Sequence, residues 1–130
     1  MSKRKKALII DDDVTIQKLL VQLCLNNGVD ADAVSSFSEI ETMLSRSDLD
    51  YDIYFVDLVL PQVSGWEIIV RIREMDHIRD KPVVVISGAK IAGEERQKLL
   101  QKANYVMLKQ EFSVSLFKRV LLQFLGAPEA

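Results

Sequence analysis

The sequence predicts an α/β fold in which helices cover both faces of a single parallel sheet. Short runs rich in β-branched residues alternate along the chain with longer stretches that place apolar residues at helical spacing. Two of the short runs, Ile53–Val56 and Val83–Ile86, are apolar at every position. Continuous apolar runs are typical of strands that are buried on both faces. The pattern therefore favours repeated strand–helix units.

Five such units follow one another. Strands are expected at Lys6–Ile10, Asp30–Val34, Asp52–Val56, Pro82–Ile86 and Tyr105–Leu108. Helices are expected at Val14–Asn26, Phe37–Arg46, Ser64–His77, Gly93–Lys102 and Ser113–Leu125. Because the chain has only 130 residues, these units are expected to form one compact domain, with a structured core over about residues 6–125.

Local signals mark several of the helix ends. Asp13 precedes the first helical stretch and is among the residues preferred as an N-cap. Gly28 follows that stretch, and glycine tolerates the left-handed conformation that closes a helix. Ser36 and Ser64 each precede a glutamate by three positions, which is the spacing of a capping box at a helix start.

The composition argues against several classes of protein. Apolar residues make up 48% of the chain, and the single cysteine, Cys24, lies in an apolar stretch and is expected to be buried. The formal net charge of -2 gives no general attraction to nucleic acid or to anionic membranes. No run approaches the length of a membrane span, and no apolar signal segment follows the basic N-terminus. We therefore expect a cytoplasmic protein without membrane insertion.

Chemically matched polar residues follow four of the expected strands. They are Asp11–Asp13, Asp57, Ser87 and Lys109. In a doubly wound sheet, the loops at the carboxyl ends of the strands form the binding crevice. Clustered carboxylates repel one another and suit Mg²⁺, which prefers oxygen ligands. A lysine and a hydroxyl in the same crevice suit a phosphoryl group, so the set predicts phosphoryl chemistry on a carboxylate.

These residues resemble the receiver domain of two-component response regulators. The likeness covers nearly the whole chain and is carried by Leu8-Ile9-Ile10-Asp11-Asp12, Asp57-Leu58-Val59-Leu60-Pro61, Gly65, Ser87-Gly88 and Lys109. It implies a flavodoxin-like, doubly wound sheet of five parallel strands in the order 2-1-3-4-5. It also implies a switch more than an enzyme, although the family catalyses its own phosphoryl transfer and slow autodephosphorylation.

The resemblance implies a role for each residue of the set. Asp57 is the phosphoacceptor, and the donor is a phosphohistidine of a sensor histidine kinase or of a histidine phosphotransfer protein. Mg²⁺ is held by Asp12 directly, by Asp11 mainly through water, and by Asp57 and the backbone carbonyl of Val59. Ser87 and Lys109 hold phosphoryl oxygens, and the small Gly88 leaves room for the incoming group. Phosphorylation then changes binding to a downstream protein target.

Two positions depart from the family's pattern. Gln110 follows Lys109, where the family usually has a proline in a cis peptide. Because a cis bond without proline costs about 2.5–4 kcal/mol, we expect this bond to be trans. Val106 stands where the family commonly has a rotating aromatic switch, and the neighbouring Tyr105 is expected to face the other side of the sheet. We therefore expect phosphorylation to be retained and its readout to differ.

One alternative function uses the same opening acids. They also match the Asp-x-Asp-x-Thr pattern of haloacid dehalogenase-type phosphatases, in which Asp11 would be the nucleophile and Asp13 the general acid. That superfamily needs a further acidic pair late in the fold, where this chain offers only Glu111 and Glu129. The alternative also leaves Asp57 without a role.

A second alternative is a receiver-like interaction module that is never phosphorylated. The absence of the usual proline and aromatic, at Gln110 and Val106, supports it. The complete set of acids, hydroxyl and lysine opposes it, because a module that only binds has no need of that chemistry.

Overall fold

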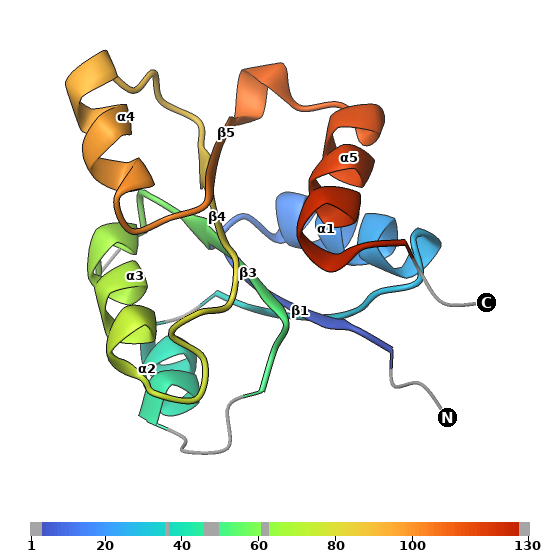
Figure 1. Cartoon of the computed structure of the whole chain (residues 1–130), viewed down its shortest axis with the longest axis horizontal. Coiled ribbons are helices and arrows are strands. Elements are labelled where there is room, and N and C mark those ends of the chain that lie inside the picture. Colours follow the sequence, from blue (N-terminus) through green and yellow to red (C-terminus); the bar gives the residue numbers. More distant parts are fainter. Residues whose placement is uncertain (1–3, 36, 46–49, 61–62, 128–130) are drawn as a thin grey trace.

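The sheet contains five parallel strands in the order β2-β1-β3-β4-β5 (Figure 1), which confirms the predicted fold class and strand order. The structure is a computed structural model that describes residues 4–35, 37–45, 50–60 and 63–127. The strands are β1 (Lys6–Ile10), β2 (Asp30–Val34), β3 (Ile53–Asp57), β4 (Val83–Ser87) and β5 (Tyr105–Leu108). Since β2 and β3 flank β1 on opposite sides, the topological switch point lies at β1 and β3, where a crevice is expected.

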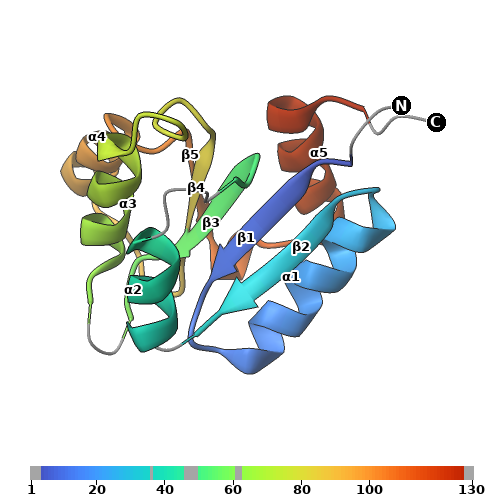
Figure 2. The ribbon, with the colours of Figure 1, turned by 90° about the horizontal axis from the view of Figure 1, so that it is seen from below.

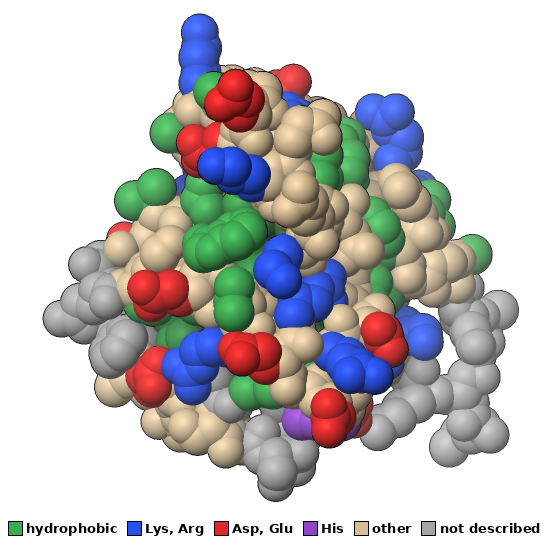
Figure 3. All heavy atoms as spheres, turned by 60° about the vertical axis from the view of Figure 1, so that its left-hand side comes forward, with side chains coloured by type: hydrophobic (Ala, Val, Ile, Leu, Met, Phe, Trp, Pro, Cys, Tyr) green, Lys and Arg blue, Asp and Glu red, His purple; other side chains and the backbone are tan. Residues whose placement is uncertain are grey.

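Helices cover both faces of this sheet. They are α1 (Val14–Asn26), α2 (Phe37–Ser45), α3 (Gly65–Glu74), α4 (Gly93–Leu100) and α5 (Val114–Leu125), and a 3₁₀ turn, η1 (Lys109–Glu111), precedes α5. The helices α1 and α5 lie on one face, whereas α2, α3 and α4 lie on the other (Figure 2). The outer surface on the side of α3 and α4 intersperses apolar, basic and acidic side chains (Figure 3).

The strand residues alternate between two apolar clusters. Leu8 and Ile10 of β1 pack toward α2, α3 and α4, whereas Ala7 and Ile9 pack toward α1 and α5. Cys24 of α1 is buried in the second cluster, as predicted. Burying a side chain of the size of leucine or isoleucine contributes about 1.5–3 kcal/mol, so both clusters hold the sheet firmly. The loops at the carboxyl ends of the strands therefore start from fixed positions.

The described caps explain where the helices begin and end. Asp13 Oδ1 accepts hydrogen bonds from the backbone N–H groups of Thr15 (2.9 Å) and Ile16 (3.3 Å), which confirms the predicted N-cap of α1. Ser64 Oγ accepts a hydrogen bond from the backbone N–H of Trp66 (3.1 Å) at the start of α3. Gly28 has a φ of 78°, as a helix stop requires. Ser36, the other predicted cap, lies outside the described residues.

Two helices are shorter than the sequence predicts. The prediction carried α3 to His77, but Met75 is extended (φ −90°, ψ 112°) and ends the helix. The prediction carried α4 to Lys102, but the chain tightens into a turn after Leu100, where the N–H of Lys102 donates to the carbonyl of Leu99, three residues earlier (3.0 Å). Arg46, the predicted end of α2, lies outside the described residues. In the described ranges, no helix combines the length and apolarity needed to cross a membrane.

Candidate functional site

Three acids meet where β1 and β3 end. Ile10 of β1 is paired with Val56 of β3, so the residues that follow them lie side by side. Each of Asp11, Asp12 and Asp57 offers a carboxylate oxygen, and these oxygens lie within 4.8 Å of one another. Asp11 and Asp57 are only 1% and 5% exposed, whereas Asp12 is exposed. The structure therefore brings together the three acids that the sequence predicted as a cluster.

Only one of the two carboxylate oxygens of Asp11 is hydrogen-bonded. Its Oδ1 accepts a hydrogen bond from the backbone N–H of Asp13 (2.8 Å), whereas its buried Oδ2 has no hydrogen-bond partner among the described residues. Burial raises the pKa of Asp11 to about 6; the bond from Asp13 opposes this shift and the nearby charge of Asp57 adds to it. A buried carboxylate oxygen without a donor suits a cation.

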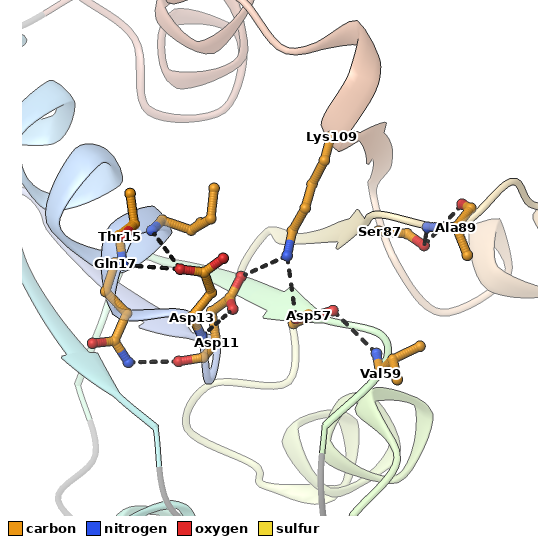
Figure 4. A network of polar contacts seen from close by, with 10 residues as sticks. Asp11, Asp13, Thr15, Gln17, Asp57, Val59, Ser87, Ala89 and Lys109 are labelled. Carbon is orange, nitrogen blue, oxygen red and sulfur yellow. Dashed lines mark hydrogen bonds and ion pairs between the residues drawn. The ribbon is translucent and has the colours of Figure 1, made fainter.

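Lys109 supplies the positive charge of the site. Its Nζ lies 3.4 Å from Asp11 Oδ2 and 3.5 Å from Asp57 Oδ2, as the dashed lines in Figure 4 show. Partial burial alone would lower the pKa of Lys109, but the charges of Asp11 and Asp57 outweigh it and raise that pKa. The ammonium group therefore stays charged between the two buried acids.

The two described ends of the loop after Asp57 lie close to the end of β3. Asp57 Oδ1 accepts a hydrogen bond from the backbone N–H of Val59 (3.1 Å), and the N–H of Gly65 donates to the carbonyl of Leu58 (3.0 Å). A Cβ atom at Gly65 would lie 2.3 Å from the backbone oxygen of Asp57. Only glycine allows α3 to begin this close to Asp57. Pro61, which is part of the predicted motif, lies outside the described residues.

Ser87 ends β4 but does not face the acids. Its hydroxyl donates to the carbonyl of Ala89 (3.0 Å) and accepts from the N–H of Ala89 (3.2 Å). Figure 4 shows Ser87 and Ala89 together, apart from the contacts of Lys109. A Cβ atom at Gly88 would lie 3.5 Å from Lys109 Cδ, an ordinary contact distance. The hydroxyl group is thus engaged within its own loop.

The two departures from the family's pattern have clear structural counterparts. The peptide bond after Lys109 is trans, as predicted, because no cis bond occurs in the described part of the chain, and η1 begins at Lys109. Val106 is 2% exposed and packs toward α3 and α4, whereas Tyr105 packs on the opposite face with α1 and α5. The carbonyl of Val106 accepts a hydrogen bond from Arg96 Nη2 of α4 (3.3 Å).

Sequence reasoning missed two further contacts of the site. Gln17 Nε2 donates a hydrogen bond to the backbone carbonyl of Asp11. The hydroxyl of Ser87 is hydrogen-bonded to the backbone N–H and carbonyl of Ala89. The position of Gln17 on the first turn of a helix that follows the acids was the signal available for the first contact. In the second contact, Ala89 contributes only its backbone N–H and carbonyl. Any residue at position 89 has these groups, so the sequence could not have indicated the contact.

The donor atoms of the site fit a magnesium ion. Mg²⁺ prefers carboxylate and water oxygens in octahedral geometry, and three carboxylates converge here from β1 and β3. Asp11 Oδ2, which forms an ion pair with Lys109 but no hydrogen bond among the described residues, is a buried acceptor that a metal ion or its water shell would satisfy. Without a cation, Lys109 is the positive charge that the described residues bring to these acids.

Comparison with known proteins shows that the chain belongs to the response regulator receiver domains. The model of this family, described as the response regulator receiver domain, matches residues 7–121. The polar-differentiation response regulator DivK of Brucella ovis is 23% identical over 122 residues, which cover 94% of this chain and 97% of DivK. Receiver domains are phosphoacceptor switches of two-component signalling, which histidine kinases phosphorylate and which act on downstream targets.

Solved structures show the same fold. The signal receiver domain of a putative Luxo repressor protein from Vibrio parahaemolyticus has a TM-score of 0.80 at 20% identity, and the match covers 94% of this chain and 90% of that one. A response regulator receiver protein from Burkholderia phymatum has a TM-score of 0.79 at 25% identity, with 95% and 97% covered. The receiver domain of the sensor histidine kinase PA1611 from Pseudomonas aeruginosa, solved with a magnesium ion coordinated in its active site cleft, has a TM-score of 0.77 at 20% identity, with 96% and 100% covered.

Proposed function

We propose that Asp57 of this receiver domain accepts a phosphoryl group from the phosphohistidine of a sensor histidine kinase or a histidine phosphotransfer protein. The observation that carries the proposal is the ion pairing of Lys109 Nζ with both Asp57 and Asp11, inside a cluster of three carboxylates. The reaction takes place in the cytoplasm and requires Mg²⁺. Phosphorylation of Asp57 then changes the affinity of the domain for a downstream protein.

The transfer is a substitution at phosphorus. A carboxylate oxygen of Asp57 forms the new P–O bond while the P–N bond to the partner's imidazole breaks. The imidazole nitrogen keeps the electron pair of that bond and takes a proton from solvent. Asp57 becomes an acyl phosphate, so the site exchanges a singly charged carboxylate for a group that carries more negative charge and three acceptor oxygens.

The residues of the chain divide the work of this step. Asp11, Asp12, Asp57 and the backbone carbonyl of Val59 hold Mg²⁺, which, when bound, neutralises charge on the phosphoryl oxygens. Lys109 already lies 3.5 Å from Asp57 Oδ2, so a phosphoryl oxygen can replace that carboxylate oxygen as its partner with little movement. The bond from the N–H of Val59 orients the Asp57 carboxylate before the donor arrives.

Ser87 links the chemistry to the readout. Its hydroxyl must leave Ala89 before it can donate to a phosphoryl oxygen, so phosphorylation draws the β4–α4 loop inward. The usual second part of the switch is an aromatic side chain that rotates between β5 and α4. Val106 fills that place and is buried, so the response of this domain is carried by the loop and by α4 instead.

The test is phosphorylation by acetyl phosphate, followed by measurement of the intact mass. With Mg²⁺, the protein should gain the mass of one phosphoryl group, and a chelator should prevent the gain. Asp57→Asn should abolish it, whereas Asp13→Asn should not, because Asp13 is the cap of α1. Labelling that persists in Asp57→Asn would favour the haloacid dehalogenase-type alternative with Asp11 as nucleophile.

The same experiment separates the proposal from a module that works by binding alone. Such a module would gain no mass from acetyl phosphate or from a phosphohistidine donor at any Mg²⁺ concentration. The ion pairs of Lys109 favour the phosphoacceptor, because an unphosphorylated module has no use for a lysine held between two buried acids.

A further inference from the structure

We propose that Gln17 is a positioning residue of the metal site, because it fixes the turn that carries Asp11 and Asp12. The inference rests on the proposed function, since it concerns the magnesium site of that reaction. Gln17 Nε2 donates a hydrogen bond to the backbone carbonyl of Asp11 (2.5 Å) and so connects α1 back to the end of β1. Figure 4 shows the side chain of Gln17 reaching this carbonyl from the helix.

Besides its ion pair with Lys109, Asp11 makes three hydrogen bonds, and the one at its carbonyl differs from the others. Its backbone N–H donates to the carbonyl of Val34 in β2 (3.2 Å), and its Oδ1 accepts from the N–H of Asp13 (2.8 Å). The third bond is accepted by its carbonyl, which belongs to the peptide group that joins Asp11 to Asp12. Among the described residues, Gln17 is the side chain that holds this peptide group. Loss of its amide would allow the peptide to rotate.

Rotation of that peptide moves Asp12 in particular. The Asp12 carboxylate is exposed and makes no hydrogen bond or ion pair within the described part of the chain, so its place depends on the backbone. Mg²⁺ requires nearly ideal octahedral geometry with ligand distances of about 2.0–2.1 Å. A small displacement of Asp12 relative to Asp11 and Asp57 would therefore weaken the metal site.

The donor itself is well anchored. Gln17 is half-buried, and its backbone N–H donates to the carbonyl of Asp13 (2.9 Å) in the first turn of α1. Further along the helix, Leu20, Leu23 and Cys24 are buried in the core. Because α1 is fixed in this way, the Gln17 amide holds the turn in one geometry before any metal arrives.

The test compares two glutamines of α1 in the full chain. Gln17→Leu and Gln17→Met remove the amide and add no charge. Gln22→Leu is the matched control, because Gln22 donates its amide to Asn26 Oδ1 (2.9 Å) on the exposed side of the same helix. Titration calorimetry with MgCl₂ gives the Kd, and thermal unfolding in EDTA gives the stability of the metal-free protein.

The Gln17 variants should bind Mg²⁺ about three- to tenfold more weakly than the wild type, which is the size of one lost hydrogen bond. Gln22→Leu should keep the wild-type Kd. At saturating Mg²⁺ the Gln17 variants should be phosphorylated by acetyl phosphate at nearly the wild-type rate, since Asp57 and Lys109 are unchanged.

Two results would overturn the assignment. A wild-type Kd in both Gln17 variants, with or without a loss of thermal stability in EDTA, would leave Gln17 a merely structural residue. The phosphoacceptor proposal would survive that result, because the wild type would still bind the metal. A wild-type protein that gives no binding heat with MgCl₂, and no Mg²⁺-dependent phosphorylation, would overturn both proposals together.

Discussion

On the β1–β3 side of the crevice the polar side chains already contact one another, whereas on the β4–α4 side the hydroxyl of Ser87 is turned to its own loop. On the first side, Asp11 and Asp57 are buried and share Lys109 at 3.4 and 3.5 Å. On the second side, the hydroxyl of Ser87 is bonded to Ala89 in its own loop. The difference separates two tasks. Under the proposed function, the groups that would perform the transfer are positioned beforehand, whereas the hydroxyl of Ser87 must first be released before it can respond to it.

The helices α1 and α4, which lie next to the two sides, also differ in how firmly they are held. α1 begins at a capped turn, where Asp13 accepts two backbone hydrogen bonds. α4 begins after Ala92 without a side-chain cap, and Leu99 is its buried residue. A helix with little buried surface and an uncapped start moves at a low free-energy cost. This makes α4 a suitable element for the response, in place of an aromatic side chain at Val106.

Removal of the lysine charge should have the largest effect. Lys109→Met keeps most of the stem and removes the ammonium group that lies between Asp11 and Asp57. The rate of phosphorylation by acetyl phosphate should fall about 10²-fold, as when one preorganised donor is lost. Lys118→Met, at an exposed position of α5, is the control and should keep the wild-type rate. Equal rates in the two variants would show that Lys109 has no part in the transfer.

The start of α3 should tolerate no side chain. Gly65→Ala places a Cβ atom 2.3 Å from the backbone oxygen of Asp57, so the helix must shift, and we expect a loss of about 1–3 kcal/mol of unfolding free energy. Gly93→Ala is the matched control, because no atom lies within 4 Å of a Cβ at that position in α4. Urea unfolding should show the control unchanged or slightly stabilised. A similar loss in both variants would mean that the approach of α3 to Asp57 is not the cause.

The contribution of Asp11 to the stability of the metal-free protein should fall as the pH rises from about 4 to about 6. Burial raises the pKa of Asp11 from 3.8 to about 6, and the charge of Asp57 adds to the shift. The folded state then holds a proton that the unfolded chain releases, so this contribution to stability is complete below pH 3.8 and is lost above the folded-state pKa. Asp11→Asn cannot lose that proton. In EDTA at about pH 7.5 it should exceed the wild type in unfolding free energy by about 1–3 kcal/mol.

The pH dependence provides the check on that prediction. The difference in unfolding free energy between Asp11→Asn and the wild type should grow from about pH 4 to about pH 7. Parallel pH curves for the two proteins would show that Asp11 titrates normally in the folded state. Added Mg²⁺ should reduce the difference in unfolding free energy. The wild type keeps all three acids and should bind the metal more tightly, so the metal should stabilise it more.

Loss of the Ser87 hydroxyl should have the smallest effect of these changes, and it should leave the acids and Lys109 on the β1–β3 side undisturbed. Ser87→Ala removes two hydrogen bonds with Ala89 and should lower the unfolding free energy by about 0.5–1.5 kcal/mol. The Kd for Mg²⁺ should stay at the wild-type value, because the hydroxyl of Ser87 is hydrogen-bonded to Ala89 and to none of the three acids in the described structure. A clear change in that Kd would contradict the separation of the two sides.

Most of the fold could be predicted from the sequence because it depends on local patterns. Apolar runs and helical spacing placed all five strands and the five helices, and the N-cap of α1 at Asp13 is confirmed. The meeting of Asp11 with Asp57 followed from parallel strands ending at one edge. The early ends of α3 and α4 could not be predicted, because they depend on how the chain turns back to the sheet.

The orientation of side chains within the site was beyond the sequence. Ser87 has the expected place at the end of β4, yet its hydroxyl is satisfied by the backbone of Ala89. The contact between Gln17 and the carbonyl of Asp11 depends on the angle at which α1 leaves β1. The clearance at Gly65 depends on how closely α3 approaches β3. Each of these features is set by three-dimensional packing and leaves no periodic signal along the chain.

The central claim is that Asp57 is the phosphoacceptor, and chemical mapping of the acyl phosphate tests it most directly. The protein is treated with acetyl phosphate and Mg²⁺, reduced with borohydride, which converts a phosphorylated aspartate to homoserine, and analysed by peptide mass spectrometry. We predict homoserine at position 57, absent when Mg²⁺ is chelated. Homoserine at position 11, or none at any position despite bound Mg²⁺, would contradict the account.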